Sequence, residues 1–376
     1  MRYVGRAVRA ILSVVIFALV LELCARVDDR ISYGAPMWSS YNADGLYEPD
    51  HVGKRGKPNA RYKKWQLNSL GFRGPELRPG TIRVVCFGAS ETFGLYEAEG
   101  QEYPRQLERD LNARAGGDVF QVVNAAYPGE TVATAILRVP QIMETVHPRY
   151  AIIYPAPAEY IWLPWLDPPK SANNGAIEPL PKFELRIADR MRIVLKSVLP
   201  SRFQSRLRQH EIDHEAAQYK LMDRVPEENV FRFRADLLAL IEALNARGLE
   251  PVLVTHADAF GEHPNAPDHN LLIAWRKFYP MLEEAGFIDM ERRMNDAMRS
   301  IALEENVTLV DAAREIPPTS EYFADFSHFT NAGSQLIAQK LAEGMKSAVG
   351  GGLHAASGPT RVNAAMASNS EWRRSP

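Results

Sequence analysis

The chain has 376 residues, of which 46% are hydrophobic and 24% are charged, so it can form one large globular domain or two smaller ones. Its 44 basic and 46 acidic residues leave a formal net charge of −2, and this balance excludes the overall basic charge typical of nucleic-acid-binding proteins. The two cysteines, Cys24 and Cys86, lie in an N-terminal apolar run and in a predicted buried strand, which excludes a disulfide scaffold.

The N-terminus predicts an export segment. Arg2, Arg6 and Arg9 precede a continuous apolar run over residues 10–21, and no small-x-small cleavage site follows it. We therefore expect residues 1–29 to be an uncleaved signal anchor that crosses the inner (cytoplasmic) membrane once, with its positive end inside. A cleaved secretory signal is the second interpretation. Both place the rest of the chain in the periplasm.

Residues 30–80 mix Gly, Pro and Asn with aromatic residues, so we expect an irregular membrane-proximal segment that wraps onto the following domain. From residue 81 onwards, β-branched runs alternate with stretches of helical periodicity. This alternation is typical of βαβ units and of a parallel sheet covered on both faces. The predicted strands cover residues 82–88, 119–125, 150–156, 250–257 and 307–311, and the predicted helices cover residues 103–116, 130–147, 229–248, 288–305 and 331–347.

Two segments depart from the alternation. Residues 162–225 contain five prolines between Pro164 and Pro181 and then basic amphipathic pieces, so they are expected to form an insertion in a domain over residues 81–348. Residues 349–376 are rich in Gly, Ser and Ala and lack an apolar period, which predicts a disordered tail.

Candidate site residues follow the predicted strands, because ligands of an open parallel sheet bind at the carboxyl ends of its strands. A serine hydroxyl becomes a nucleophile when a base removes its proton, and a histidine can be that base when a third group fixes its tautomer. The residues at these positions are Ser90, Gly129, Glu159, His256, Asp325 and His328.

Three of these residues suit nucleophilic catalysis. With two residues between them, Asp325 can reach one ring nitrogen of His328, while the other ring nitrogen faces Ser90. The backbone N–H groups of Ser90 and Gly129 are candidate donors to an oxyanion. Glu159 and His256 are candidate substrate-binding residues.

These segments resemble the SGNH (GDSL) hydrolases. The stretch "GASET", Gly129 in "NAAYPGETV", and "DFSH" look like the first, second and fifth blocks of that superfamily. The stretch "LNSLGFRGPEL" after an apolar segment looks like a membrane-anchored bacterial branch. The resemblance covers about residues 66–160 and 229–347. It implies a three-layer α/β/α, flavodoxin-like fold and a triad of Ser90, His328 and Asp325 that cleaves or transfers acyl groups on oxygen.

The third block departs from the family pattern. The family has an asparagine before an acidic residue, whereas "PAPAEY" places Ala158 before Glu159. A side-chain donor to the oxyanion typically contributes about 10²- to 10³-fold in rate. SGNH-like O-acetyltransferases of bacterial cell-surface polysaccharides often lack this asparagine, so the resemblance leaves acyl transfer open beside hydrolysis.

We expect an exported serine esterase that acts on O-acyl esters, with carbohydrate as the alcohol and no metal or organic cofactor. The expected partners are an acylated carbohydrate or other ester and the inner membrane, with membrane proteins of polysaccharide biosynthesis as further candidates and no nucleic acid.

Two other functions stay open. The segment "HEIDH" (His210 to His214) has the H-E-x-x-H spacing of a zinc hydrolase, although its surroundings are polar. A non-catalytic polysaccharide-binding or assembly protein is the other alternative, with aromatic residues near the third strand as its sugar-stacking surface. Those residues are Tyr154, Tyr160, Trp162 and Trp165.

Overall fold

The computed structural model describes residues 2–346 except Ser40, residues 164–184, Leu199, Glu262 and residues 266–267. A five-stranded sheet forms its centre, and every neighbouring pair of its strands is parallel. The strands are β5 (Ile82–Gly88), β6 (Phe120–Asn124), β7 (Tyr150–Tyr154), β8 (Glu250–Val254) and β9 (Thr308–Val310). Their spatial order is β6-β5-β7-β8-β9, which is the flavodoxin-like order 2-1-3-4-5.

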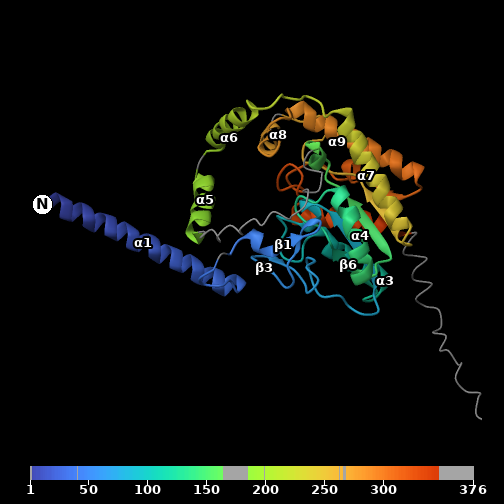
Figure 1. Cartoon of the computed structure of the whole chain (residues 1–376), viewed down its shortest axis with the longest axis horizontal. Helices are drawn as coiled ribbons and strands as arrows, with labels where there is room; N and C mark the ends of the chain where they lie inside the picture. Colours follow the sequence, from blue (N-terminus) through green and yellow to red (C-terminus); the bar gives the residue numbers. More distant parts are fainter. Residues whose placement is uncertain are drawn as a thin grey trace, which may run out of the picture.

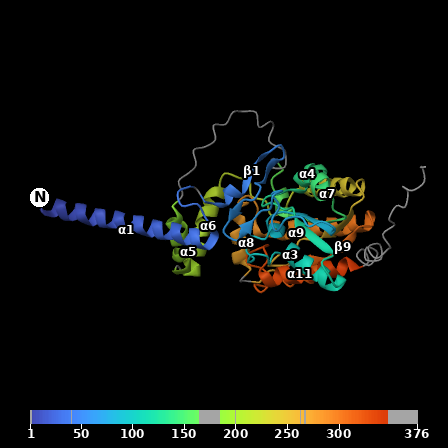
Figure 2. The same ribbon diagram turned by 90° about the horizontal axis from the view of Figure 1, so that it is seen from below.

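Helices cover both faces of this sheet (Figures 1 and 2). One face carries α4 (Val132–Val146), α7 (Glu227–Asn245) and α9 (Glu284–Glu304), and the other carries α3 (Tyr103–Ala115) and α11 (Asn331–Gly344). The three-layer α/β/α arrangement with five parallel strands is therefore confirmed. Shorter helices, which the sequence did not indicate, are α8 (His269–Arg276) and α10 (Ala312–Glu315).

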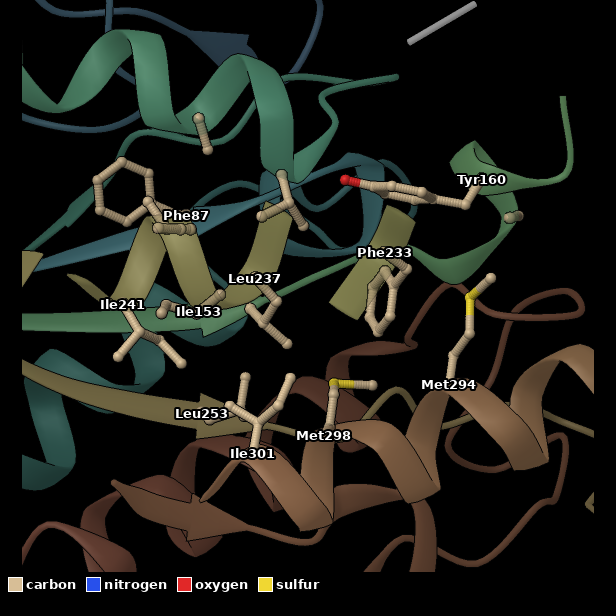
Figure 3. Packing of buried hydrophobic residues seen from close by; sticks show 14 of the residues in the cluster. Phe87, Ile153, Tyr160, Phe233, Leu237, Ile241, Leu253, Met294, Met298 and Ile301 are labelled. Atoms are coloured by element: carbon tan, nitrogen blue, oxygen red, sulfur yellow. The ribbon is translucent and has the colours of Figure 1, made fainter. Parts of the chain in front are cut away.

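Two hydrophobic cores follow from the alternation of side chains along the strands. In β5, Val85 and Phe87 face the α4, α7 and α9 layer, whereas Val84 and Cys86 face the α3 and α11 layer. Figure 3 shows the first core, in which Phe87 and residues of β7 and β8 face side chains of α7 and α9. Each fully buried large aliphatic or aromatic side chain stabilises the fold by about 1.5–3 kcal/mol.

The fourth strand is shorter than the sequence predicts. The prediction covers residues 250–257, but β8 ends at Val254. Beyond it, the N–H of His256 donates to Asn295 Oδ1 at 2.8 Å, and the N–H of Ala257 donates to the Tyr154 hydroxyl at 3.1 Å. Because side chains take the place of a strand partner, the chain leaves the sheet at His256.

The segment before β5 contains two small antiparallel sheets. The first pairs β1 (Tyr47–Asp50) with β2 (Gly53–Gly56), and the second pairs β3 (Arg61–Tyr62) with β4 (Trp65–Gln66). A 3-10 helix, η1 (Ala43–Leu46), precedes them. They pack on the large domain through a small core of Leu46, Tyr62, Leu67, Phe93 and Ala126.

The N-terminal helix α1 (Arg2–Tyr33) extends away from the domain (Figures 1 and 2). Its segment Val8–Tyr33, which has 26 residues, is long and apolar enough to cross a membrane, as judged from length and composition. Near its C-terminal end α1 contacts α5 (Arg186–Val198), which is followed by α6 (Ser201–Ala216). The proline-rich part of the expected insertion and the expected disordered tail lie outside the described residues.

Candidate active site

Ser90 lies directly after β5, at the first residue of the short helix α2 (Ser90–Phe93). The turn into α2 is tight, because a Cβ on Gly88 would lie 2.2 Å from Thr92 Oγ1 and 2.8 Å from the Tyr154 carbonyl oxygen. A glycine is therefore needed there to bring Ser90 to the carboxyl edge of the sheet. This edge, between β5 and β7, is where the strand order reverses and where ligands of such sheets bind.

His328 and Asp325 meet Ser90 at this edge from the loop before α11. The Ser90 hydroxyl is 2.8 Å from His328 Nε2, and His328 Nδ1 is 2.9 Å from each oxygen of the Asp325 carboxylate. Because the carboxylate accepts from Nδ1, Nε2 is left to accept the serine proton. The structure thus brings together the three residues that the sequence singles out for nucleophilic catalysis.

The Asp325 carboxylate is fixed by the backbone of its own loop. Its Oδ1 accepts the N–H of Ser327 at 3.1 Å and the N–H of His328 at 2.9 Å. Burial raises the pKa of Asp325, but the hydrogen bond and the charge of His328 outweigh burial, so the pKa is lowered from its ordinary value. Asp325 is therefore ionised and can stabilise the imidazolium that forms when His328 takes a proton.

Glu91, the residue after Ser90, adds a buried carboxylate to the site. Its Oε2 is 3.3 Å from the Ser90 hydroxyl, and its Oε1 accepts the Ser327 hydroxyl at 2.9 Å. Burial raises the pKa of Glu91, but His256 and His328 outweigh burial and lower it to about 2. Sequence reasoning missed Glu91, although an acid directly after the candidate nucleophile, in a turn of small residues, was the available signal.

His256 lies behind Glu91 rather than at the edge of the site. Its Nδ1 is 2.9 Å from Glu291 Oε2, its Nε2 is 3.8 Å from Glu91 Oε1, and its ring stacks on Tyr154. Burial lowers the pKa of His256, but the two carboxylates outweigh burial and raise it to about 10. The side chain is therefore a buried cation between two carboxylates, and it reaches Ser90 only through Glu91.

The sequence analysis did not single out Glu291 either. It lies on α9 at helical spacing from Phe287, Met294 and Met298, all of which are buried. An acid within such an apolar face was the signal, because a buried carboxylate needs a partner. Burial raises the pKa of Glu291, and its contact with His256 opposes that rise, so that the pKa lies above its ordinary value.

Gly129 lies in the loop after β6. The N–H of Tyr127 donates to the Gly88 carbonyl at 3.3 Å, which places the start of this loop beside the residues that lead to Ser90. Gly129 has a φ of +76°, a conformation that residues with a Cβ rarely adopt. The ammonium of Lys54, on β2, donates to the carbonyl of Pro128 at 2.8 Å, so the membrane-proximal segment also reaches this loop.

Ala158 and Glu159 lie after β7 in the 3-10 helix η2 (Pro157–Tyr160). Ala158 is buried in the core and its methyl group offers no hydrogen-bond donor. Burial and the charge of Glu91 raise the pKa of Glu159, and Lys54 opposes this rise, so that the pKa is about 7. Glu159 is thus close enough to the triad to interact electrostatically with Glu91.

The aromatic residues considered for sugar stacking are mostly core residues. Tyr154 and Tyr160 are buried, and the Tyr160 hydroxyl donates to Asp236 at 2.8 Å, so neither ring face is open to a glycan. Trp162 is half-buried and packs edge-on against Tyr219. Trp165 lies outside the described residues.

His210 and His214, the histidines of the H-E-x-x-H segment, lie on α6, which packs against α8. Within the described part of the chain, no group of three or more His, Cys, Asp or Glu side chains is arranged to hold a metal ion.

The pH dependence of activity should follow His328. Burial lowers the pKa of His328, but the hydrogen bond of Asp325 and the charges of Glu91 and Asp325 outweigh burial and raise it above its ordinary value of 6.5. A general base must be neutral, so kcat/KM is expected to fall as the pH drops through this raised pKa. Glu91→Gln removes one of the negative charges and should move the acid limb of the kcat/KM profile to lower pH.

The matched control for that profile is Glu304→Gln, which changes an exposed acid that hydrogen-bonds Ser300 and Arg234. Its acid limb should coincide with that of the wild type. An acid limb that stays in place in Glu91→Gln would show that Glu91 does not act on His328.

No family model matches the sequence, and no curated protein matches it. The solved structures found to be similar include a lipolytic protein of the G-D-S-L family from Desulfitobacterium hafniense DCB-2, with 12% identity and a TM-score of 0.40 over 70% of this chain and 99% of that one. A lipase/acylhydrolase from Enterococcus faecalis has 16% identity and a TM-score of 0.42 over 71% of this chain and 97% of that one. A catalytic mutant of an acetylxylan esterase from Geobacillus stearothermophilus has 16% identity and a TM-score of 0.42 over 72% of this chain and 97% of that one.

Proposed function

We propose that this protein is a membrane-anchored serine esterase of the SGNH type that acts on O-acyl esters. The observation that carries the proposal is the 2.8 Å contact between the Ser90 hydroxyl and His328 Nε2, with Asp325 on the other ring nitrogen at 2.9 Å. Ser90 and the loop that holds His328 and Asp325 are far apart in the sequence, and together they supply a nucleophile, its base and the group that orients the base.

The proposed reaction has two halves. Ser90 Oγ attacks the ester carbonyl carbon while His328 Nε2 takes the hydroxyl proton, and the resulting oxyanion accepts hydrogen bonds from the N–H groups of Ser90 and Gly129. The C–O bond to the alcohol then breaks, and His328 returns the proton to the departing oxygen. In the second half, water attacks the acyl-Ser90 ester with His328 as base, which releases the acid and restores the serine.

The location and the alcohol are part of the same proposal. An uncleaved α1 would hold the domain at the periplasmic face of the inner membrane, where acylated carbohydrates are exposed to it. The apolar length of α1 supports an anchor.

Acyl transfer to a sugar hydroxyl is the second candidate, and Ala158 is the observation that favours it. The methyl of Ala158 leaves the oxyanion without the side-chain amide that the family pattern supplies. A transferase would use the same triad, and a sugar hydroxyl would replace water in the second half of the reaction.

The test of this function is turnover of p-nitrophenyl acetate by the full chain in detergent. We expect release of p-nitrophenol and a transient acetyl group on Ser90. Since the proposed steps use no metal, EDTA should leave the rate unchanged, whereas a zinc hydrolase formed through His210 and His214 would lose activity. A folded protein that neither turns over nor becomes acylated with several esters would be the binding protein considered above.

A glycan acceptor added to the same assay separates the two acyl reactions. A hydrolase releases acetate at an unchanged rate, whereas a transferase forms acetylated glycan and its p-nitrophenol release accelerates.

A further inference from the structure

Helix α5 carries an apolar stripe that is exposed in the described part of the chain. Ile187, Met191, Leu195 and Val198 follow one another at spacings of four, four and three residues, which places them on one helix face. Met191, Leu195 and Val198 are exposed by 62%, 62% and 74%. A helix of a soluble domain would turn such a stripe toward the core, so this face is built for another environment.

The N-terminal half of α5 is fixed to the C-terminal half of α1. The N–H of Ile187 donates to Glu22 Oε2 at 2.9 Å, so an acid of α1 caps the start of α5. Arg190 pairs with Asp28 at 2.7 Å and with Asp29 at 2.8 Å. Glu22 and Asp29 are buried at this junction, which shows that α5 covers charges of α1 that would otherwise be open.

The two helices cross rather than run side by side. In Figures 1 and 2, α5 lies across the axis of α1 near the C-terminal end of α1. If α1 crosses the bilayer with its apolar run, which ends at Leu21, a helix held by Glu22 and Asp29 crosses α1 where that run ends and lies along the membrane surface. The orientation is that of an interfacial amphipathic helix.

Apolar and aromatic side chains surround the crossing. A cleft of about 380 Å³ between the helices is lined by Val15, Leu19 and Leu23 of α1 together with Trp38, Leu185 and Ile187. Trp38 is 79% exposed, and exposed tryptophans are typical of the level where lipid headgroups meet acyl chains.

A basic residue lies beside the stripe. Arg192, which follows Met191 on α5, is exposed, and an exposed basic residue next to an apolar helix face is attracted to anionic lipid headgroups.

We infer that α5 is a membrane-surface helix, and that its apolar stripe inserts into the outer leaflet beside α1 and holds the esterase domain against a bilayer containing anionic phospholipid. This rests on the part of the proposed function that keeps α1 as a membrane anchor, but it does not depend on the reaction.

Spin labels on the full chain in lipid nanodiscs test the inference. Cys24 is replaced by serine, while the buried Cys86 is left in place. Single cysteines for nitroxide labelling are then introduced as Leu195→Cys and Val198→Cys on the stripe, and the nanodiscs contain phosphatidylcholine and phosphatidylglycerol. The ratio of collisions with oxygen to collisions with a water-soluble nickel chelate reports whether each label lies in lipid.

Two further labels give the references. Leu303→Cys, on a residue of α9 that is 85% exposed, marks water, and Phe17→Cys, on an exposed residue of α1, marks the bilayer interior. We expect the ratio at residues 195 and 198 to be several-fold higher than at residue 303.

The collision ratios at the different labels distinguish a failure of the α5 inference from a failure of the α1 anchor. Stripe labels that match residue 303 while residue 17 lies in lipid would overturn the inference and leave the anchor intact. A water-exposed label at residue 17 would overturn the anchor and the inference together, and the Ser90 reaction would be unaffected.

Discussion

Ser90→Ala is expected to lower kcat for ester hydrolysis by about 10⁴-fold or more, because no other group can form the acyl-enzyme once the hydroxyl is lost. Ser90 is at the first residue of α2 and its hydroxyl contacts His328 and Glu91. Its removal deletes the nucleophile and leaves the backbone N–H in place. The measurement is single-turnover and steady-state kinetics with p-nitrophenyl acetate, together with mass spectrometry of the acetylated protein.

Ser69→Ala is the matched control, since the Ser69 hydroxyl donates to Glu76 on the surface and takes no part in the site. It should retain wild-type kcat and acetylation at Ser90. Acetylation that persists elsewhere in a folded Ser90→Ala variant, with undiminished turnover, would exclude Ser90 as the nucleophile.

Asp325→Asn should cost about 10⁴-fold in kcat while the protein stays folded. An asparagine can still accept the N–H groups of Ser327 and His328 through its carbonyl oxygen. Its NH₂ group would then face His328 Nδ1, where the carboxylate now accepts a hydrogen bond at 2.9 Å. That arrangement favours the tautomer with the proton on Nε2, which cannot take the proton of Ser90. Kinetics at several pH values and thermal unfolding together measure the effect.

Asp296→Asn provides the comparison for Asp325→Asn, because Asp296 is an exposed acid that pairs with Arg299 on the surface of α9. Its kcat should equal that of the wild type. If Asp325→Asn keeps more than a tenth of wild-type kcat at the same thermal stability, then Asp325 does not set the tautomer of His328.

That Ser90, Asp325 and His328 meet could be predicted from the sequence because each of them adjoins a recognisable element. Ser90 follows a β-branched strand, and Asp325 and His328 directly precede an apolar-periodic helix. A parallel sheet brings such positions to one edge whatever their separation in sequence. Strand order and loop placement therefore indicate which residues meet at the edge of the sheet, whereas residue spacing alone does not.

The buried charges behind the triad could not be predicted in the same way. Glu91, His256 and Glu291 belong to α2, to the loop after β8 and to α9, and their contact depends on how closely α9 packs against the sheet. The aromatic pattern near β7 misled for a related reason. Tyr154 and Tyr160 lie near the end of the third predicted strand, where exposed aromatic rings could stack on a sugar, but tertiary packing places both rings in the interior.

The buried charges of Glu91 and His256 make the stability of the fold depend on pH. Glu91, with a pKa of about 2, stabilises the fold above its ordinary pKa of 4.5 and loses this contribution as the pH falls toward 2. His256, with a pKa of about 10, contributes fully below 6.5 and progressively less as the pH rises to 10.

The contributions of Glu91 and His256 are together most favourable between pH 4.5 and 6.5, whereas His328 becomes a competent base only above its raised pKa. A pH series of thermal unfolding should therefore place the most heat-resistant state at a lower pH than the most active one. The catalytic rate would then be highest at a pH where the buried charges stabilise the fold less. At lower pH the protein would be inactive but more stable to heat.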